Sequence, residues 1–265
     1  MSGSVLTASG VDMRFGGVVA LRGAAVEVAQ GQIVGLIGRN GSGKTTLFNC
    51  ITGFIRPSGG SIRLDGREIG GMAPHQIVRA GVVRTFQTPR IEVRCSVREA
   101  VLCGLYPTVR HGFFASALCT PKARAEERRL QRDALEAIQR LGLDKWIDSE
   151  VGRLSMAGLR MVEVCRAVAS RARFLLLDEP AAGLSADERA ILAREIRKLA
   201  SEGIGVLLVE HNFGLIRMLC DTVTVLDSGS VLVTGSPEAI ARDEQVLELY
   251  LGSAAEAPMQ QEVRD

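Results

Sequence analysis

The chain lacks the features that mark several large classes of protein. It has no apolar run near the roughly 18–20 residues that a membrane-spanning helix needs, and residues 1–10 lack the basic start and long apolar stretch of a secretory signal. Its formal net charge of +2 is too balanced to suggest a nucleic-acid binder. None of its 6 cysteines forms a C-x-x-C pair, which leaves metal binding through cysteine with little support. What remains, with 46% hydrophobic and 23% charged residues, is typical of a globular protein without internal repeats.

Residues 38–45 read GRNGSGKT and fit the phosphate-loop pattern Gly-x-x-x-x-Gly-Lys-[Ser/Thr]. The glycines let backbone N–H groups curl around phosphate oxygens, Lys44 can reach the β- and γ-phosphates, and the Thr45 hydroxyl can ligate Mg²⁺. The apolar run 33–37 predicts a strand before the loop, and residues 44–52 predict a helix whose positive N-terminus faces the phosphates. This context favours a phosphate loop over an ordinary glycine turn. An ATP-binding chain is expected in the cytosol, with its cysteines free.

The remaining pattern predicts an α/β fold. Residues 174–177 and 205–209 are fully apolar strands separated by an amphipathic helix at 186–202, which implies a parallel sheet covered on both faces. Short β-like pieces at 18–21 and 26–28 precede the phosphate loop, and residues 58–66 predict a hairpin.

Residues 122–141 predict a long helix with one apolar stripe. Its other faces carry many arginines, which could form a basic surface for lipid or nucleic acid. Acidic residues are interleaved with them, so we favour a solvated helix face.

Two acids, Asp178 and Glu179, end the strand at 174–177. A carboxylate at the carboxyl end of a strand beside a phosphate loop is placed to hold Mg²⁺, which we assign to Asp178. Glu179, one residue on, points the other way and can polarise a water aimed at the γ-phosphate. An ordinary strand-end turn is the alternative, and the phosphate loop argues against it.

With these motifs, residues 5–252 resemble the ATP-binding subunits of ABC transporters. The resemblance implies that Phe15 stacks on adenine, that Gln87 links Mg²⁺ and the γ-phosphate to the membrane subunits, and that His211 senses the γ-phosphate. It also implies a signature loop at 154–158 (LSMAG), which contacts ATP on an opposing subunit. The residues implied in nucleotide binding are Phe15, Gly38, Asn40, Gly41, Ser42, Gly43, Lys44, Thr45 and Thr46. The residues implied in catalysis are Glu179, His211, Gln87 and Lys44. Those implied in metal binding are Thr45, Gln87 and Asp178. Those implied in the signature contact are Ser155, Ala157 and Gly158. His75 and His111 are expected at the surface without such a role.

Two departures from the family pattern concern contacts between subunits. Ala157 and Gly158 replace the second Gly and the Gln of the family's LSGGQ, and Ser185 replaces the usual Asp of the dimer-contact loop 182–185. If the loop needs a positive φ or a close approach at residue 157, Ala157 weakens the composite site.

The resemblance also implies an architecture. It predicts a P-loop core with an N-terminal antiparallel β region in residues 1–87 and 169–252, a helical subdomain in residues 88–168, and a disordered tail at 253–265. The apolar stretch 106–121 either packs under the helical subdomain or docks on the membrane subunits.

Finer similarities, among them VRTFQ at 83–87 and YLG at 250–252, point to the larger ATPase subunit of branched-chain amino-acid importers. The implied partners are two membrane permeases, a second ATPase subunit or a second copy in a head-to-tail dimer, and indirectly a solute-binding protein, at the cytoplasmic face of the inner membrane. Importers of urea, amides or aromatic acids are the near alternative. A soluble ABC ATPase acting on nucleic acid or ribosomes is the distant one. It is disfavoured because long coiled-coil insertions and a second cassette are absent.

Overall fold

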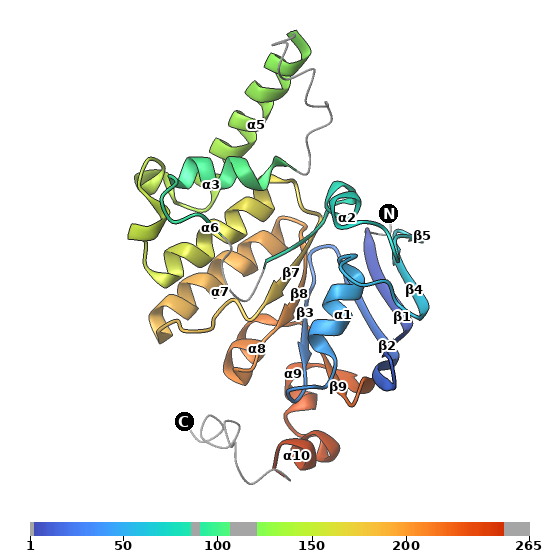
Figure 1. Ribbon diagram of the computed structural model, residues 1–265. Helices are drawn as coiled ribbons and strands as arrows, with labels where there is room; N and C mark the ends of the chain where they lie inside the picture. Colours follow the sequence, from blue (N-terminus) through green and yellow to red (C-terminus); the bar gives the residue numbers. More distant parts are fainter. Residues whose placement is uncertain (1–2, 86–90, 107–120, 252–265) are drawn as a thin grey trace.

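The computed structural model describes residues 3–85, 91–106 and 121–251, and Figure 1 shows how its elements are arranged. The strands are β1 (Val5–Phe15), β2 (Val18–Ala29), β3 (Ile33–Ile37), β4 (Gly59–Leu64), β5 (Arg67–Glu68), β6 (Val82–Arg84), β7 (Phe174–Asp178), β8 (Gly205–Val209), β9 (Thr222–Asp227) and β10 (Ser230–Gly235). The helices are α1 (Lys44–Ile51), α2 (Pro74–Ala80), α3 (Val97–Gly104), α5 (Pro121–Arg140), α6 (Met156–Ala169), α7 (Ala186–Ser201), α8 (Phe213–Leu219), α9 (Pro237–Ile240) and α10 (Glu244–Leu251). Short 3-10 helices lie at Asp144–Trp146 and Val151–Arg153.

The predicted parallel sheet is present. Its strands run in the order β10-β9-β3-β8-β7-β6, and all neighbours pair in parallel except the edge strand β10. Alternate residues of β3 and β7 belong to two separate core clusters. Ile33 and Leu175 pack toward α6 and α7, whereas Val34 and Leu176 pack toward α1 and the N-terminal strands. The sheet is therefore covered on both faces, as its uninterrupted apolar strands predict.

The N-terminal β region is a separate antiparallel sheet in the order β2-β1-β4-β5. The two short pieces predicted at 18–21 and 26–28 are one strand, β2. Its pairing with β1 shifts register at several points, and Gly23 has a φ of 64°, so the apolar alternation is interrupted although the strand continues. The hairpin predicted at 58–66 contains β4 and the turn, but its second strand, β5, lies just beyond that range. Its turn at Asp65 and Gly66 has positive φ at both residues, as a tight two-residue turn requires.

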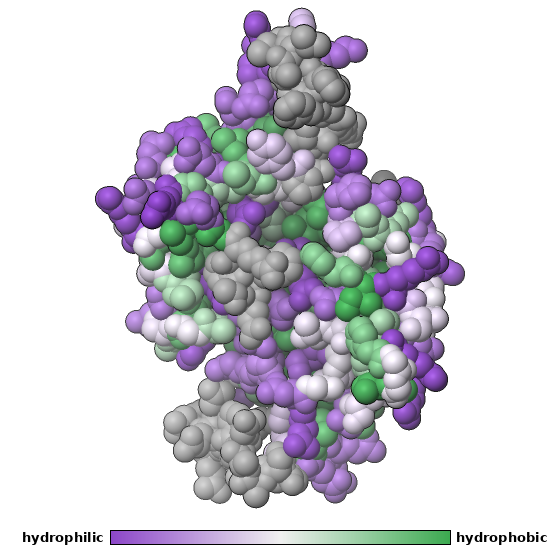
Figure 2. Space-filling model, viewed as in Figure 1, coloured by the Kyte–Doolittle hydropathy of each residue, from purple (hydrophilic) through white to green (hydrophobic). Residues whose placement is uncertain are grey.

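Between residues 91 and 169 the described elements are helical. The long helix predicted at 122–141 is α5, and Ala134, Ala137 and Ile138 on its apolar stripe are buried against α3 and α6. Part of α5 projects from the body (Figure 1), and its projecting end is hydrophilic in Figure 2. Arg124, Arg128 and Arg132 are exposed, which agrees with a solvated face. Arg129 forms ion pairs with Glu126 and with the buried Asp133. The division into core and helical subdomain stays a prediction.

Some sequence predictions concern residues outside the described ranges. These are Gln87, His111, the tail at 253–265, and all of the apolar stretch 106–121 except Tyr106 and Pro121. Tyr106 is exposed. His75 is exposed on α2, as expected. The described cysteines are free. In the part of the chain that the structure covers, no helix is both long and apolar enough to cross a membrane.

Candidate functional site

The phosphate loop connects β3 to α1 through a backbone that only glycine can adopt at two positions. Gly38 has a φ of 153°, and a Cβ there would lie 2.1 Å from the Leu226 carbonyl oxygen. Gly43, the residue before α1, has a φ of 103°, and a Cβ there would lie 2.8 Å from the Ala20 carbonyl oxygen. The loop is thus held between the start of β2 and the end of β9, with the N-terminus of α1 directed into it.

Lys44 is folded back over this loop. Its Nζ donates hydrogen bonds to the carbonyl oxygens of Gly38, at 2.7 Å, and Arg39, at 3.0 Å. Burial lowers the pKa of Lys44, and the carboxylates of Glu179 and Asp178 oppose that shift. These two acids therefore act on the same ammonium group. The phosphate loop and the acidic pair form one site.

Ser42 gives independent evidence that the loop accommodates a ligand. Its side chain is only 3% exposed, and its Oγ has no hydrogen-bond partner among the residues that the structure covers. A buried hydroxyl without a partner costs about 1–3 kcal/mol, which a phosphate oxygen accepting its proton would recover. The residues present therefore fit a bound phosphate.

The two acids at the end of β7 have different partners. Asp178 is buried and accepts a hydrogen bond of 2.6 Å from Arg84 Nη2. Glu179 lies 2.8 Å, Oε1 to Nε2, from His211, which follows β8. The predicted difference in direction is present, and it pairs the proposed general base with the proposed phosphate sensor.

Glu179 has a left-handed backbone, with a φ of 47°. Its N–H donates to the Val209 carbonyl oxygen at 2.9 Å, which fixes the turn against the end of β8. A residue with a Cβ pays about 1–2 kcal/mol for this conformation. Such strain persists where the surroundings impose it, and it is concentrated at functional sites.

Glu210 connects two backbone segments of the site, a role that the sequence did not predict. It is buried, and its carboxylate accepts hydrogen bonds from the backbone N–H groups of Ala181, at 2.9 Å, and His211, at 3.3 Å. Burial raises the pKa of Glu210. The side chain joins the loop after Glu179 to the residue that carries the imidazole. The sequence feature that could have indicated this role is an acidic residue directly after the apolar strand β8.

The signature loop begins helix α6. Ser155 is its N-cap and accepts a hydrogen bond from the Gly158 N–H at 3.2 Å. Ser185 is the N-cap of α7, in a reciprocal pair with Glu188. Hydrogen bonds from Ser185, and more weakly from the Ser155 hydroxyl, lower the pKa of Glu188. Ser185 thus caps α7, a position that Asp would also suit.

One expectation about Ala157 is wrong. Residue 157 lies in the first turn of α6, and it is not among the described residues with positive φ. A right-handed helical backbone does not require glycine, and alanine is the better helix former. The predicted conformational strain at Ala157 is therefore absent.

Ala157→Gly is consequently expected to destabilise the protein slightly. The loss of helix propensity amounts to about 0.5–1 kcal/mol, which lowers the melting temperature by roughly 1–4 °C in a chain of this length. Thermal denaturation of the two proteins side by side measures this. A higher melting temperature in the variant would show that Ala157 is strained after all.

Phe15 lies at the end of β1, with its side chain 47% exposed. Phe15 pairs with Val18 across the turn between β1 and β2. Two residues further along β2, the Ala20 carbonyl oxygen lies next to Gly43 of the phosphate loop. An exposed aromatic ring at this position suits stacking on a base.

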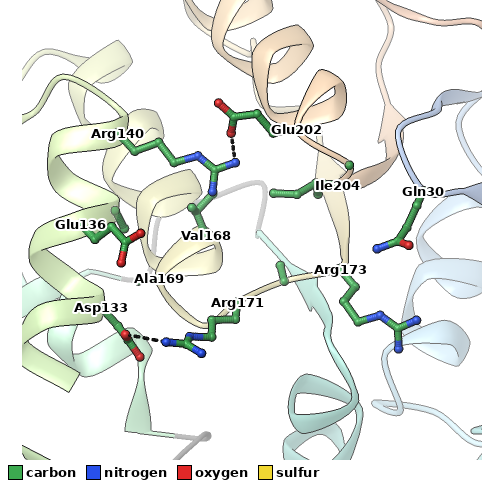
Figure 3. A pocket seen from close by; sticks show the side chains of 13 residues that line it. Gln30, Asp133, Glu136, Arg140, Val168, Ala169, Arg171, Arg173, Glu202 and Ile204 are labelled. Atoms are coloured by element: carbon green, nitrogen blue, oxygen red, sulfur yellow. Dashed lines mark hydrogen bonds and ion pairs between the residues drawn. The ribbon is translucent and has the colours of Figure 1, made fainter. Parts of the chain in front are cut away.

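A cavity of about 390 Å³ lies where α5, α6 and α7 meet the start of β7 (Figure 3). The three arginines that line it form ion pairs. Arg171 binds Asp133 at 2.9 Å, Arg140 binds Glu202, and Arg173 binds Asp65. These ion pairs tie α5 to the sheet and to the end of α7, so the cavity is a structural junction at a distance from the acidic pair.

Comparison with known proteins gives a consistent result. The family model described as ABC transporter matches residues 21–182. The high-affinity branched-chain amino acid transport ATP-binding protein BraF of Pseudomonas aeruginosa is 41% identical over 255 residues, covering 96% of this chain and 100% of that protein. Its counterpart LivG of Escherichia coli K12 is 36% identical over the same coverage.

Solved structures agree with the sequence relatives. An ATP-binding cassette of an ABC transporter in its ADP conformation is 28% identical, with a TM-score of 0.82 over 94% of this chain and 99% of that one. A nucleotide-free cassette is 27% identical, with a TM-score of 0.82 over 93% and 98%. With the phosphate loop, the acidic pair and the signature helix in the order that the family requires, this chain belongs to the ABC transporter family.

Proposed function

We propose that this chain is the ATP-hydrolysing subunit of an importer for branched-chain or other hydrophobic amino acids. The observation that supports the proposal is 36–41% identity over 96% of the chain to subunits named for that transport. The contact between Glu179 and His211, the pair to which we assign catalysis, agrees with it. The chain would act at the cytoplasmic face of the inner membrane, bound to two permease subunits. A solute-binding protein would deliver the amino acid to those permeases from the other side.

ATP binding would begin at the phosphate loop. The triphosphate takes the place of the Gly38 and Arg39 carbonyl oxygens as the partner of Lys44 Nζ, and the Ser42 hydroxyl gains the acceptor that it lacks. Backbone N–H groups at the start of α1 provide further donors. Phe15 covers the adenine. Asn40, Gly41 and Thr46 lie in or next to the loop and complete the cradle.

The donors that face the phosphates fit Mg²⁺. Thr45 is exposed in the first turn of α1, and Asp178 keeps Oδ1 free of hydrogen bonds among the described residues. A hydroxyl and a carboxylate oxygen are ligands that this ion accepts beside phosphate oxygens and waters. When bound, Mg²⁺ neutralises charge that develops on the phosphates. Gln87, outside the described residues, is the remaining proposed ligand.

Hydrolysis would depend on the pair at the end of β7 and β8. The Glu179 carboxylate accepts the proton of a water directed at the γ-phosphate, and His211 orients that carboxylate through the 2.8 Å contact. Because Glu179 is only partly exposed, little reorganisation accompanies proton transfer.

A second subunit would complete the site. Ser155, Ala157 and Gly158 begin a helix whose N-terminus can contact a γ-phosphate bound to an opposing subunit, either a second copy or a different ATPase chain. Closure of this head-to-tail dimer would move the permeases, and hydrolysis would reopen it.

The proposed partners are tested by assembly of the complex and by stimulation of its ATP hydrolysis. Permease subunits of a branched-chain amino-acid importer, co-expressed with the tagged chain, are expected to co-purify with it in detergent. In nanodiscs the complex should hydrolyse ATP faster when the binding protein and leucine are added. Stimulation by urea or an aromatic acid, and not by leucine, would reassign the solute. Recovery of ribosomes or nucleic acid in place of permeases would contradict the proposal.

A further inference from the structure

Arg84 is a buried cation next to the proposed metal ligand, and the mechanism above gives it no role. It ends β6, the edge strand of the core sheet, opposite Leu176 of β7. Its side chain is only 6% exposed. A guanidinium is rarely buried to this extent unless its charge and its N–H groups are compensated.

The partners of Arg84 come from the two elements that form the ATP site. Nη1 donates to Asn49 Oδ1 at 2.6 Å, and the guanidinium carbon lies 5.3 Å from the centre of the Phe48 ring, both residues of α1. Nη2 donates to Asp178 Oδ2 at 2.6 Å. Arg84 therefore joins the helix that follows the phosphate loop to the strand that carries the metal ligand.

The positive charge of Arg84 determines whether it strengthens or weakens metal binding at Asp178. A carboxylate that accepts a hydrogen bond from a metal-bound histidine makes that histidine a stronger donor. A guanidinium does the opposite to a carboxylate, because it already compensates the negative charge that would attract the ion. No cluster of three or more His, Cys, Asp or Glu side chains within the described ranges could hold a metal ion by itself. Thr45 and Asp178, the described residues assigned to the metal, provide two ligands, so phosphate oxygens would supply others.

We propose that Arg84 is a resident counter-cation of Asp178, a positioning residue that competes with Mg²⁺ for this carboxylate and makes metal binding conditional on ATP. It holds Oδ2, leaves Oδ1 without a hydrogen bond among the described residues, and balances the charge of Asp178 before nucleotide binds. When ATP adds its negative charge, Mg²⁺ can share Asp178 with Arg84. The inference rests on the proposed function only in requiring that ATP and Mg²⁺ bind here.

The test measures how much Mg²⁺ improves ATP binding. The ratio of the ATP dissociation constant in EDTA to that in Mg²⁺ is determined by calorimetry in the Glu179→Gln background, so that hydrolysis does not interfere. Arg84→Gln keeps hydrogen-bond donors and removes the charge. The ratio is expected to rise about tenfold, since the ion no longer competes with a cation at Asp178. An unchanged or smaller ratio in Arg84→Gln overturns the proposal.

Two matched variants separate charge from structural support. Arg84→Lys keeps the charge without the forked geometry, and its ratio is expected to stay within about threefold of the parent. Asn49→Ala removes the other anchor of Arg84 and is expected to behave likewise. An equal rise in all three variants would show that general loosening changes the ratio, and would reject the role of charge. If the parent binds no ATP at all, the proposed function fails. If it binds ATP with a normal Mg²⁺ advantage that Arg84→Gln leaves unchanged, only the inference fails.

A measurement on the parent protein covers the case in which Arg84→Gln does not fold. The ¹⁵Nε–H signal of Arg84, assigned by its loss in Arg84→Lys, is expected to shift when Mg²⁺ is added to the ATP complex. Adding Mg²⁺ without nucleotide should leave the Arg84 signal unshifted. A shift of equal size without nucleotide, or none with it, contradicts the competition.

Discussion

Lys44→Ala is expected to weaken ATP binding by about 100-fold or more. The ammonium group now held by two loop carbonyl oxygens is the cation that the loop offers to the phosphates. Two charge-assisted hydrogen bonds contribute about 1.5–3 kcal/mol each, and every 1.4 kcal/mol is tenfold in affinity. Calorimetric titration with ATP and Mg²⁺ measures the loss.

Lys145→Ala is the matched control, because it removes the same charge from an exposed position in another part of the fold. Its ATP affinity should equal that of the parent. A Lys44→Ala protein that still folds and binds ATP with unchanged affinity would remove residues 38–45 from the nucleotide site.

Glu179→Gln is expected to lower the rate of ATP hydrolysis by about 10²-fold or more while ATP binding is kept. Gln has the same shape and can keep the contact with His211, but it cannot accept the proton of the attacking water. The closed state should then accumulate as an ATP-bound dimer, because hydrolysis no longer ends it. Phosphate release and light scattering with ATP report the two effects.

Glu238→Gln, an exposed substitution of the same kind in the first turn of α9, serves as the control for the rate. It changes a residue that lies outside the proposed nucleotide site and the proposed dimer contacts. Hydrolysis by Glu179→Gln within a few-fold of the parent would contradict the assignment of Glu179 as the base, whatever its effect on dimerisation.

Local sequence patterns were sufficient where the signal was short and continuous. The run 33–37, the glycines after it and the helix from Lys44 are successive, so β3, the loop and α1 could be predicted together. The strand ending in Asp178 was equally clear, since residues 174–177 are all apolar, and the structure buries them. These segments position the chemistry, and the sequence predicted their order correctly.

Contacts between distant segments were not predictable in the same way. Arg84 reads as an ordinary charged residue at the end of a short strand, and only the fold places it between Asn49 and Asp178. The positive φ considered for Ala157 was wrong because a family glycine suggested a special backbone, whereas Ser155 caps a regular helix there. Conformation at such a position depends on where the helix begins, which the residue type alone does not determine. The close approach to an opposing subunit stays a prediction.

If ATP hydrolysis at this site drives amino-acid import, uptake of radiolabelled leucine into proteoliposomes will depend on it. The proteoliposomes would contain this chain with its permeases and any second ATPase subunit, with ATP inside and the binding protein outside. Leucine accumulation is expected to require internal ATP and Mg²⁺ and to be lost in proteoliposomes made with Lys44→Ala. An assembled complex that hydrolyses ATP but accumulates no leucine, or one whose uptake is unaffected by Lys44→Ala, would contradict the proposed coupling.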